Sequence, residues 1–98
     1  MDEEQAYAIA RQISEGHAYK KHVVEGDDFP EIKSREEFAD LIHEAITDRL
    51  SLEKSLDDGR QAFWSERRRT LVIIDWWSRD GGTALRPRRG RAYFRQLE

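Results

Sequence analysis

The chain has 98 residues and a mass of 11.6 kDa, a length that suits one domain and excludes a second. Charged residues make up 38% of it, so the surface must be densely ionic, yet three Trp, three Tyr and four Phe can fill a small core. The absence of cysteine excludes disulfides, thiolate metal sites and cysteine nucleophiles. No apolar run approaches the roughly 20 residues that cross a bilayer, so we expect no membrane segment.

The charges divide between the two parts of the chain. Residues 1–59 contain 7 basic and 16 acidic residues, a net charge of −9, whereas residues 60–98 contain 10 basic and 4 acidic residues, a net charge of +6. Every basic residue in the second part is an arginine, whose planar guanidinium suits bidentate contact with phosphate. A polyanionic partner is one explanation, and neutralisation of the acidic part by the basic part within one molecule is the other.

The first half of the chain has the pattern of helices. Ala6, Ile9, Ala10 and Ile13 follow amphipathic helical spacing, and the acidic residues before them favour a helix start near Asp2. Gly16 is typical of a helix end. We expect a further helical stretch over 17–24 and a loop over 25–33, where glycine, aspartate and proline are concentrated.

A second helix start is marked by Ser34-Arg35-Glu36-Glu37. This is a capping box, in which the serine and the glutamate three residues later bond to each other's free backbone N–H groups. The apolar residues that follow keep helical spacing, so we predict a helix from Arg35 to about Leu50.

The pattern changes after the polar stretch 51–59. Short runs rich in β-branched and aromatic residues predict strands over 61–65, 70–76 and 83–86, joined by hairpin-length turns into an antiparallel meander. The apolar run Val72-Ile73-Ile74 indicates a strand covered on both faces. The expected fold class is α+β: one domain over 1–98 in which a helical part, 1–50, packs on a small antiparallel sheet within a β-rich part, 60–98.

One group of residues has the composition of a catalytic site. His17, Lys21 and His22 fall within six positions; His17 and Lys21 share one face of an α-helix, and His22 lies about 140° further round. An imidazole can exchange a proton near neutral pH, and an ammonium can stabilise a negative transition state. A solvated basic helix surface with incidental histidines remains the alternative. The i, i+5 histidine spacing does not fit helical zinc ligands, so we expect no metal and no cofactor.

A second group occurs in the stretch Asp80-Gly81-Gly82-Thr83-Ala84-Leu85-Arg86-Pro87. Its glycines allow close backbone approach, while Thr83 and Arg86 add a hydroxyl and a guanidinium, so the stretch could hold a phosphate. It lacks the lysine of a P-loop. A glycine-rich β-turn with no ligand is the alternative.

Several of these motifs together resemble the C-terminal ribonuclease toxin domains of bacterial polymorphic and contact-dependent growth inhibition toxins, of the barnase/EndoU/colicin D type. The resemblance covers residues 16–97. It rests on Gly16-His17-Ala18 with Lys21-His22-Val23, on the run from Phe29 to Ala39, on Asp58-Gly59-Arg60 through Phe63-Trp64, and on Gly81 to Pro87 with Gly90 and Tyr93-Phe94.

This resemblance implies a function. It implies metal-independent cleavage of RNA, with tRNA a frequent target, by a toxin that is secreted as part of a larger protein and acts in the cytoplasm of a target bacterium. It also implies a cognate immunity protein, so the domain is expected as a monomer or as a toxin–immunity heterodimer. The implied catalytic residues are His17, Lys21, His22 and Thr83, and the candidate substrate-binding residues are Arg60, Arg86 and Arg88. Lys20 competes with Lys21 for its role. A non-catalytic RNA- or protein-binding module that uses the arginine-rich sheet is the alternative.

Overall fold

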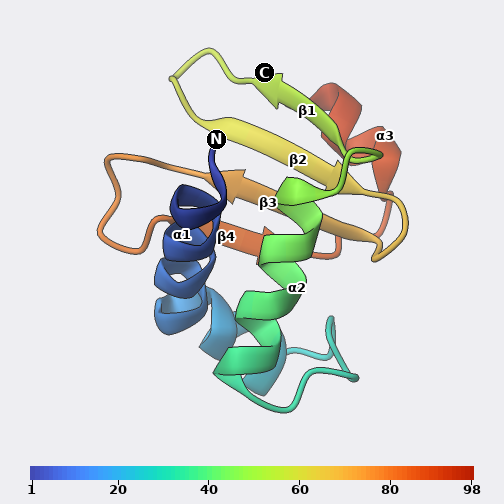
Figure 1. The fold of residues 1–98 in the computed structure, drawn as a ribbon. Helices are drawn as coiled ribbons and strands as arrows, with labels where there is room; N and C mark the ends of the chain where they lie inside the picture. Colours follow the sequence, from blue (N-terminus) through green and yellow to red (C-terminus); the bar gives the residue numbers. More distant parts are fainter.

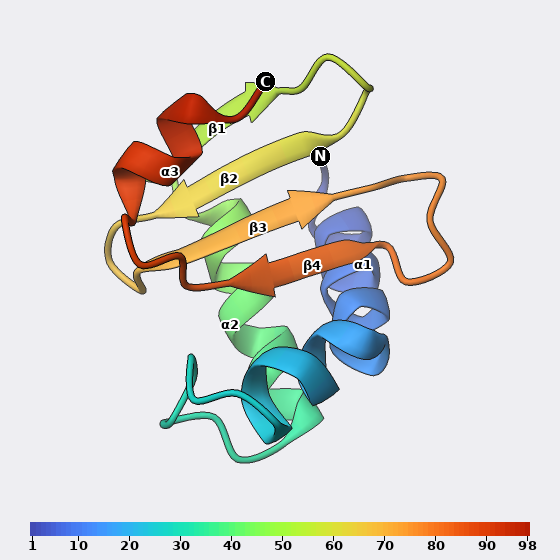
Figure 2. The ribbon, with the colours of Figure 1, turned by 180° about the vertical axis from the view of Figure 1, so that it is seen from behind.

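The computed structural model describes residues 1–98 and confirms the α+β fold class. Helices come first, followed by a four-stranded antiparallel sheet in the order β1-β2-β3-β4. The two long helices cover one face of this sheet, and the short C-terminal helix lies against the other (Figures 1 and 2). The elements are α1 (Glu3–Glu15), the π-helix η1 (Tyr19–Val24), α2 (Arg35–Thr47), β1 (Leu52–Ser55), β2 (Gln61–Ser65), β3 (Thr70–Ile74), β4 (Gly82–Leu85) and α3 (Arg91–Gln96).

The predicted starts of both long helices are confirmed. The Asp2 carboxylate accepts a hydrogen bond of 2.7 Å from the backbone N–H of Gln5 at the start of α1. At the start of α2, the Ser34 hydroxyl accepts one of 3.1 Å from the N–H of Glu37. The Glu37 carboxylate accepts from the N–H of Lys33 rather than from that of Ser34, so it caps the chain one residue earlier than the sequence pattern predicts.

The helical stretch expected over 17–24 is present, but most of it is π-helical. Gly16 ends α1, and the chain is helical again from His17, with π-type bonding over η1. The N–H of Glu25, for example, bonds to the carbonyl of Lys20 at 2.8 Å. Such π-helices are rare and are frequently found at functional sites. His22 lies within η1, whereas His17 lies just before it.

The sheet contains one strand that the sequence analysis missed. β1 lies within the stretch 51–59, which was expected to be a polar connection, and pairs with β2 in the register Leu52↔Trp64 to Ser55↔Gln61. The side chains of β1 are mostly exposed, so no alternation of apolar residues marks it. This edge strand depends instead on backbone hydrogen bonds to its neighbour.

β3 is shorter than predicted, because its pairing with β4 stops at Ile74↔Gly82. The N–H of Asp75 bonds to the carbonyl of Gly81 at 2.8 Å, which closes the turn. Asp75 and Trp76, which the predicted strand 70–76 includes, are not part of β3. Trp76 and Trp77 lie in the turn and are exposed. A Cβ on Gly82 would lie 1.9 Å from the carbonyl oxygen of Ile73, and Gly82 has φ +131°, so only glycine fits this start of β4.

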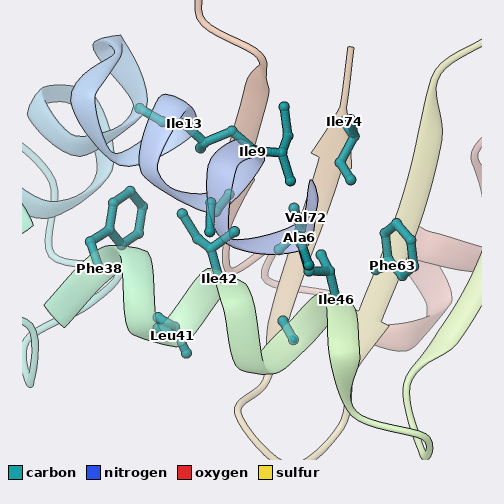
Figure 3. Close-up of a cluster of buried hydrophobic side chains, with 14 of the residues drawn as sticks. Ala6, Ile9, Ile13, Phe38, Leu41, Ile42, Ile46, Phe63, Val72 and Ile74 are labelled. Carbon is teal, nitrogen blue, oxygen red and sulfur yellow. The ribbon is translucent and has the colours of Figure 1, made fainter. Parts of the chain in front are cut away.

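The main core lies between the helices and the sheet (Figure 3). The apolar stripes of α1 and α2 face each other and the sheet side chains of Phe63, Val72 and Ile74. Ala18, at the start of the second helical stretch, is also fully buried, with Tyr19 and Val23 packed against this core.

A smaller core covers the other face of the sheet. Trp64, Leu71 and Ile73 point to this side and pack with Leu56 and with Phe94 of α3. Residues of β3 therefore enter both cores alternately, which confirms that this strand is covered on both faces. The longest helices have 13 residues, and none is long and apolar enough to span a membrane.

Candidate active site

His17 is paired with an aspartate that is distant in the sequence. It follows Gly16 directly, and its Nδ1 atom bonds to the carboxylate of Asp80 in the β3–β4 connection. The histidine side chain is 62% exposed. A Cβ on Gly16 would lie 2.9 Å from the Cβ of Asp80, so the glycine allows the two segments to approach closely. The end of α1 and the β3–β4 turn together position His17.

His22 is paired with a second aspartate in the same way. Its Nδ1 atom lies 3.0 Å from a carboxylate oxygen of Asp28, which belongs to the loop between η1 and α2. Only 15% of the His22 side chain is exposed, so this imidazole is held more firmly than that of His17. His17 and His22 thus have separate carboxylate partners on separate segments.

These contacts fix the tautomer of both imidazoles. An ionised carboxylate can only accept hydrogen bonds, so the hydrogen must be on Nδ1 in each pair. In the neutral imidazole, Nε2 then has a free lone pair and can accept a proton. Histidine bases of hydrolases are oriented by carboxylates in the same manner. Both histidines therefore have the arrangement of a general base, or of a general acid once Nε2 is protonated.

The two lysines of the cluster differ in their surroundings. Lys20 lies 4.0 Å from Glu25, with both side chains largely exposed. Lys21 is exposed and forms no ion pair. Of the two competing ammonium groups, that of Lys21 is the one without a carboxylate partner, and it is adjacent in sequence to His22. No group of three His, Asp or Glu side chains is placed to hold a metal ion.

Thr83 lies on the other side of the sheet. It is opposite Ile73 in the register of β3 and β4, and Ile73 belongs to the core under α3. Because strand side chains alternate between faces, Thr83 points to that side. η1, in contrast, lies beyond the β4 edge of the sheet (Figure 2), and its Tyr19 and Val23 pack against the core between the helices and the sheet. The structure gives Thr83 no hydrogen bond to either histidine.

The three candidate phosphate-binding arginines are separated. Arg60 bonds to Asp58 at 2.7 Å beside the β1–β2 turn. Its backbone N–H, with its side chain, lowers the pKa of Asp58. Arg88 is exposed and unpaired, and it follows β4 at the opposite end of the strands. Arg86 is close to a histidine pair, because its Nη1 donates to the carbonyl of Asp28 at 3.0 Å.

Arg86 is the centre of a dense set of contacts. Its guanidinium forms a bidentate pair with Glu31 at 2.8 and 2.5 Å, donates to the carbonyl of Arg68 at 2.9 Å and lies 4.5 Å from the centre of the Phe29 ring. The hydrogen bonds from Arg86 lower the pKa of Glu31 from 4.5 to about 2. Arg86 therefore joins the His22–Asp28 loop to β4 and the β2–β3 turn.

The principal hollows of the surface do not include the histidine pairs. The largest, of about 570 Å³, is bordered by the start of α1, the end of α2 and Trp76. Another, of about 330 Å³, is lined only by Glu31, Arg67, Arg68, Arg69 and Arg86. None of the five principal hollows includes His17, Lys21, His22 or Thr83.

The sequence analysis missed the partners of both histidines. In the sequence, Asp80 belongs to a glycine-rich turn and Asp28 to the loop expected over 25–33, and neither position indicates a histidine partner. His17 and Asp80 are 63 positions apart, so only the folded chain could reveal that pair. His22 and Asp28 are six apart, and the signal was the coincidence of a histidine with an acidic, glycine-containing loop.

Comparisons with known proteins do not assign the chain to a family. No protein-family model matches it, and no curated protein is significantly similar to it.

Proposed function

We propose that this chain is a metal-independent endoribonuclease toxin domain. The observation that carries the proposal is the pair of histidines within six positions, each with Nδ1 bonded to an aspartate. The resemblance of residues 16–97 to ribonuclease toxin domains supports the same conclusion. The π-helical geometry of the segment that contains His22 also supports it, since such segments are frequent at functional sites.

In the proposed reaction, Nε2 of one histidine removes the proton from a ribose 2′-hydroxyl. The 2′-oxygen attacks the adjacent phosphorus, and the bond between phosphorus and the 5′-oxygen breaks. Nε2 of the other histidine, protonated beforehand, gives its proton to the departing 5′-oxygen. The products are a 2′,3′-cyclic phosphate and a 5′-hydroxyl, so atoms and charge balance. Only RNA supplies this internal nucleophile.

Lys21 completes the proposed site. Its ammonium has no carboxylate partner and can stabilise the negative charge that develops on the phosphoryl oxygens. Thr83 would take part only if the RNA passes around the β4 edge, because its side chain belongs to the other face of the sheet.

The biological setting follows from the resemblance. We propose delivery as part of a larger secreted protein, action on RNA such as tRNA in the cytoplasm of a target bacterium, and neutralisation by an immunity protein in the producing cell. The acidic first part of the chain, with its net charge of −9, offers a basic immunity protein a complementary surface.

The test is RNA cleavage in EDTA by the wild type and by His17→Ala, His22→Ala and the double variant. Each single variant should lose about a hundredfold or more in rate, because general acid–base catalysis is typically worth about 10²–10⁴-fold. The wild-type products should carry 2′,3′-cyclic phosphate ends. His43→Ala is the matched control: His43 lies on α2 beside Tyr7 and Glu3, away from the cluster. Full cleavage by the double variant would contradict the assignment.

A second candidate function is a non-catalytic module that binds RNA or an acidic protein. The observation that favours it is the hollow lined by four arginines and one glutamate, whose lining includes none of the candidate catalytic residues. Tight RNA binding without any cleavage in the same assay would select this function.

A further inference from the structure

The hollow between the β2–β3 turn and the loop before α2 contains no apolar side chain. It measures about 330 Å³ and is lined by Arg67, Arg68 and Arg69 of the turn, by Arg86 after β4 and by Glu31. Arg67 is 3.7 Å from Asp48, and Arg68 is 2.8 Å from Glu44. Arg69 has no ion pair. Arg67, Arg68 and Arg86 each have a carboxylate partner, so the positive charge of Arg69 is the one left without a partner at this hollow.

Arg69 also adopts an unusual backbone conformation. Its φ of +50° makes it the one residue other than glycine with a positive φ. Glycine or asparagine is the usual choice there, and a side chain such as that of arginine costs of order 1–3 kcal/mol. This turn thus places an arginine without an ion pair at the border of the hollow.

Glu31 occupies the hollow as an internal anion. Its two carboxylate oxygens bond to the two Nη atoms of Arg86 at 2.8 and 2.5 Å, in the fork geometry in which a guanidinium also binds phosphate. The Glu31 side chain is 44% exposed and belongs to a loop rather than to a helix or strand. A phosphate group of a ligand can therefore exchange with it.

We propose that this hollow binds a phosphate of single-stranded RNA and that Glu31 competes with that phosphate for Arg86. The inference rests on the proposed function for the identity of the ligand. Arg86 also bonds to the carbonyl of Asp28, whose carboxylate orients His22. An RNA strand bound in the hollow would therefore extend toward the imidazole of His22. The phosphate in the hollow would be a neighbour of the phosphate that is cleaved.

The experiment measures binding of a fluorescent 2′-O-methyl RNA oligonucleotide, which cannot be cleaved, by anisotropy over a range of salt concentrations. Arg69→Gly should weaken binding about five- to tenfold at 50 mM salt and reduce the salt slope by about 0.7, the value of one phosphate contact on a single strand. Its melting temperature should stay at or above that of the wild type, because glycine suits φ +50°. Arg11→Ala on α1 removes the same charge away from the hollow and should weaken binding less than twofold.

Glu31→Gln should change the affinity for the oligonucleotide in the opposite direction. It frees Arg86, so affinity should rise about fivefold, whereas Glu15→Gln, with the same change in charge, should raise affinity less than twofold. Equal effects of Arg69→Gly and Arg11→Ala, or equal effects of the two glutamate variants, would overturn the proposal. Preference for an acidic protein over the oligonucleotide would also overturn it.

Binding of the uncleavable oligonucleotide and cleavage of RNA are measured in separate assays, so this proposal and the catalytic assignment can fail separately. If the wild type cleaves RNA as expected but Arg69→Gly leaves oligonucleotide binding unchanged, the phosphate site is wrong and the ribonuclease proposal stands. If the variants change binding as expected but the wild type does not cleave RNA, the ribonuclease proposal is wrong and the phosphate site stands.

Discussion

At the scale of single residues, the orientation of the histidines is the feature on which function depends. The sequence marked His17 and His22 as candidates because two imidazoles and two lysines stand within six positions. It could not show that Asp80 and Asp28 bond to their Nδ1 atoms, since one of these contacts depends on how a distant turn folds back. Composition identifies acid–base groups, but tertiary contacts decide which nitrogen carries the hydrogen.

Asp80→Asn tests this orientation directly. An amide can donate to Nδ1 and so favour the other tautomer, with the hydrogen on Nε2, which removes the base from the reaction. We expect cleavage to fall by at least about tenfold, and by no more than the roughly 10²–10⁴-fold that general acid–base catalysis is worth. The melting temperature should change little, because the His17 side chain is 62% exposed. Asp40→Asn on the exposed side of α2 is the control and should leave the rate unchanged.

Glu31 gives a residue-scale prediction in the acid range. Its folded-state pKa of about 2 is below the ordinary 4.5, so ionised Glu31 stabilises the fold above pH 4.5 and that contribution is lost as the pH falls toward 2. The free energy of unfolding of the wild type should exceed that of Glu31→Gln at pH 7, and the difference should shrink steadily below pH 4.5. Urea unfolding of both proteins at several pH values measures it. A difference that is constant with pH would show that Glu31 does not act through its charge.

At the scale of elements, those with a strong local signal were predicted and those that depend on a neighbour were not. The helix starts at Asp2 and Ser34 follow from side chains that cap their own helix. β1 was not predicted because its side chains are mostly polar and exposed and show no alternation of apolar and polar residues. Only its backbone pairing with β2 makes it a strand. The strand predicted to Trp76 ends at Ile74 for a related reason: the tight turn imposed by Asp75 and Gly81 outweighs the strand preference of tryptophan.

The start of β4 provides an element-scale prediction. In Gly82→Ala the new Cβ would collide with the carbonyl oxygen of Ile73, 1.9 Å away, at a φ of +131°. We expect a loss of at least about 2 kcal/mol in the free energy of unfolding, because the backbone of both strands must shift. Gly90→Ala is the matched control: it also has positive φ, but its nearest neighbour is 3.6 Å away, so it should cost about 1 kcal/mol. Equal losses in chemical denaturation would contradict this account of Gly82.

At the scale of the whole molecule, β3 joins the two cores. Val72 and Ile74 belong to the core under α1 and α2, and Leu71 and Ile73 to the core under α3. Loss of either core exposes one side of the same strand. The charge asymmetry is also a property of the whole chain: ion pairs such as Arg68–Glu44 and Arg86–Glu31 link the basic part to the acidic part. Internal neutralisation therefore accounts for some of the arginines, while Arg69 and Arg88 stay unpaired.

The shared strand predicts that both cores unfold in one transition. In a variant with Trp76→Phe and Trp77→Phe, fluorescence reports only Trp64 in the smaller core, whereas far-ultraviolet circular dichroism is dominated by α1 and α2. The two urea curves should have the same midpoint, as two-state unfolding requires. An earlier fluorescence transition would mean that α3 and its core open separately.

The strand order β1-β2-β3-β4 also bears on how quickly the chain reaches its folded state. Every strand pairs with its neighbour in sequence, and α1 packs against α2, the next α-helix along the chain. Such local contacts keep contact order low and close small loops, which in domains of mixed helix and strand corresponds to folding faster than in all-β barrels. No strand has to be threaded between two others already paired. The sheet of this chain can therefore form by successive pairing of near-neighbour strands, without waiting for a long-range crossover.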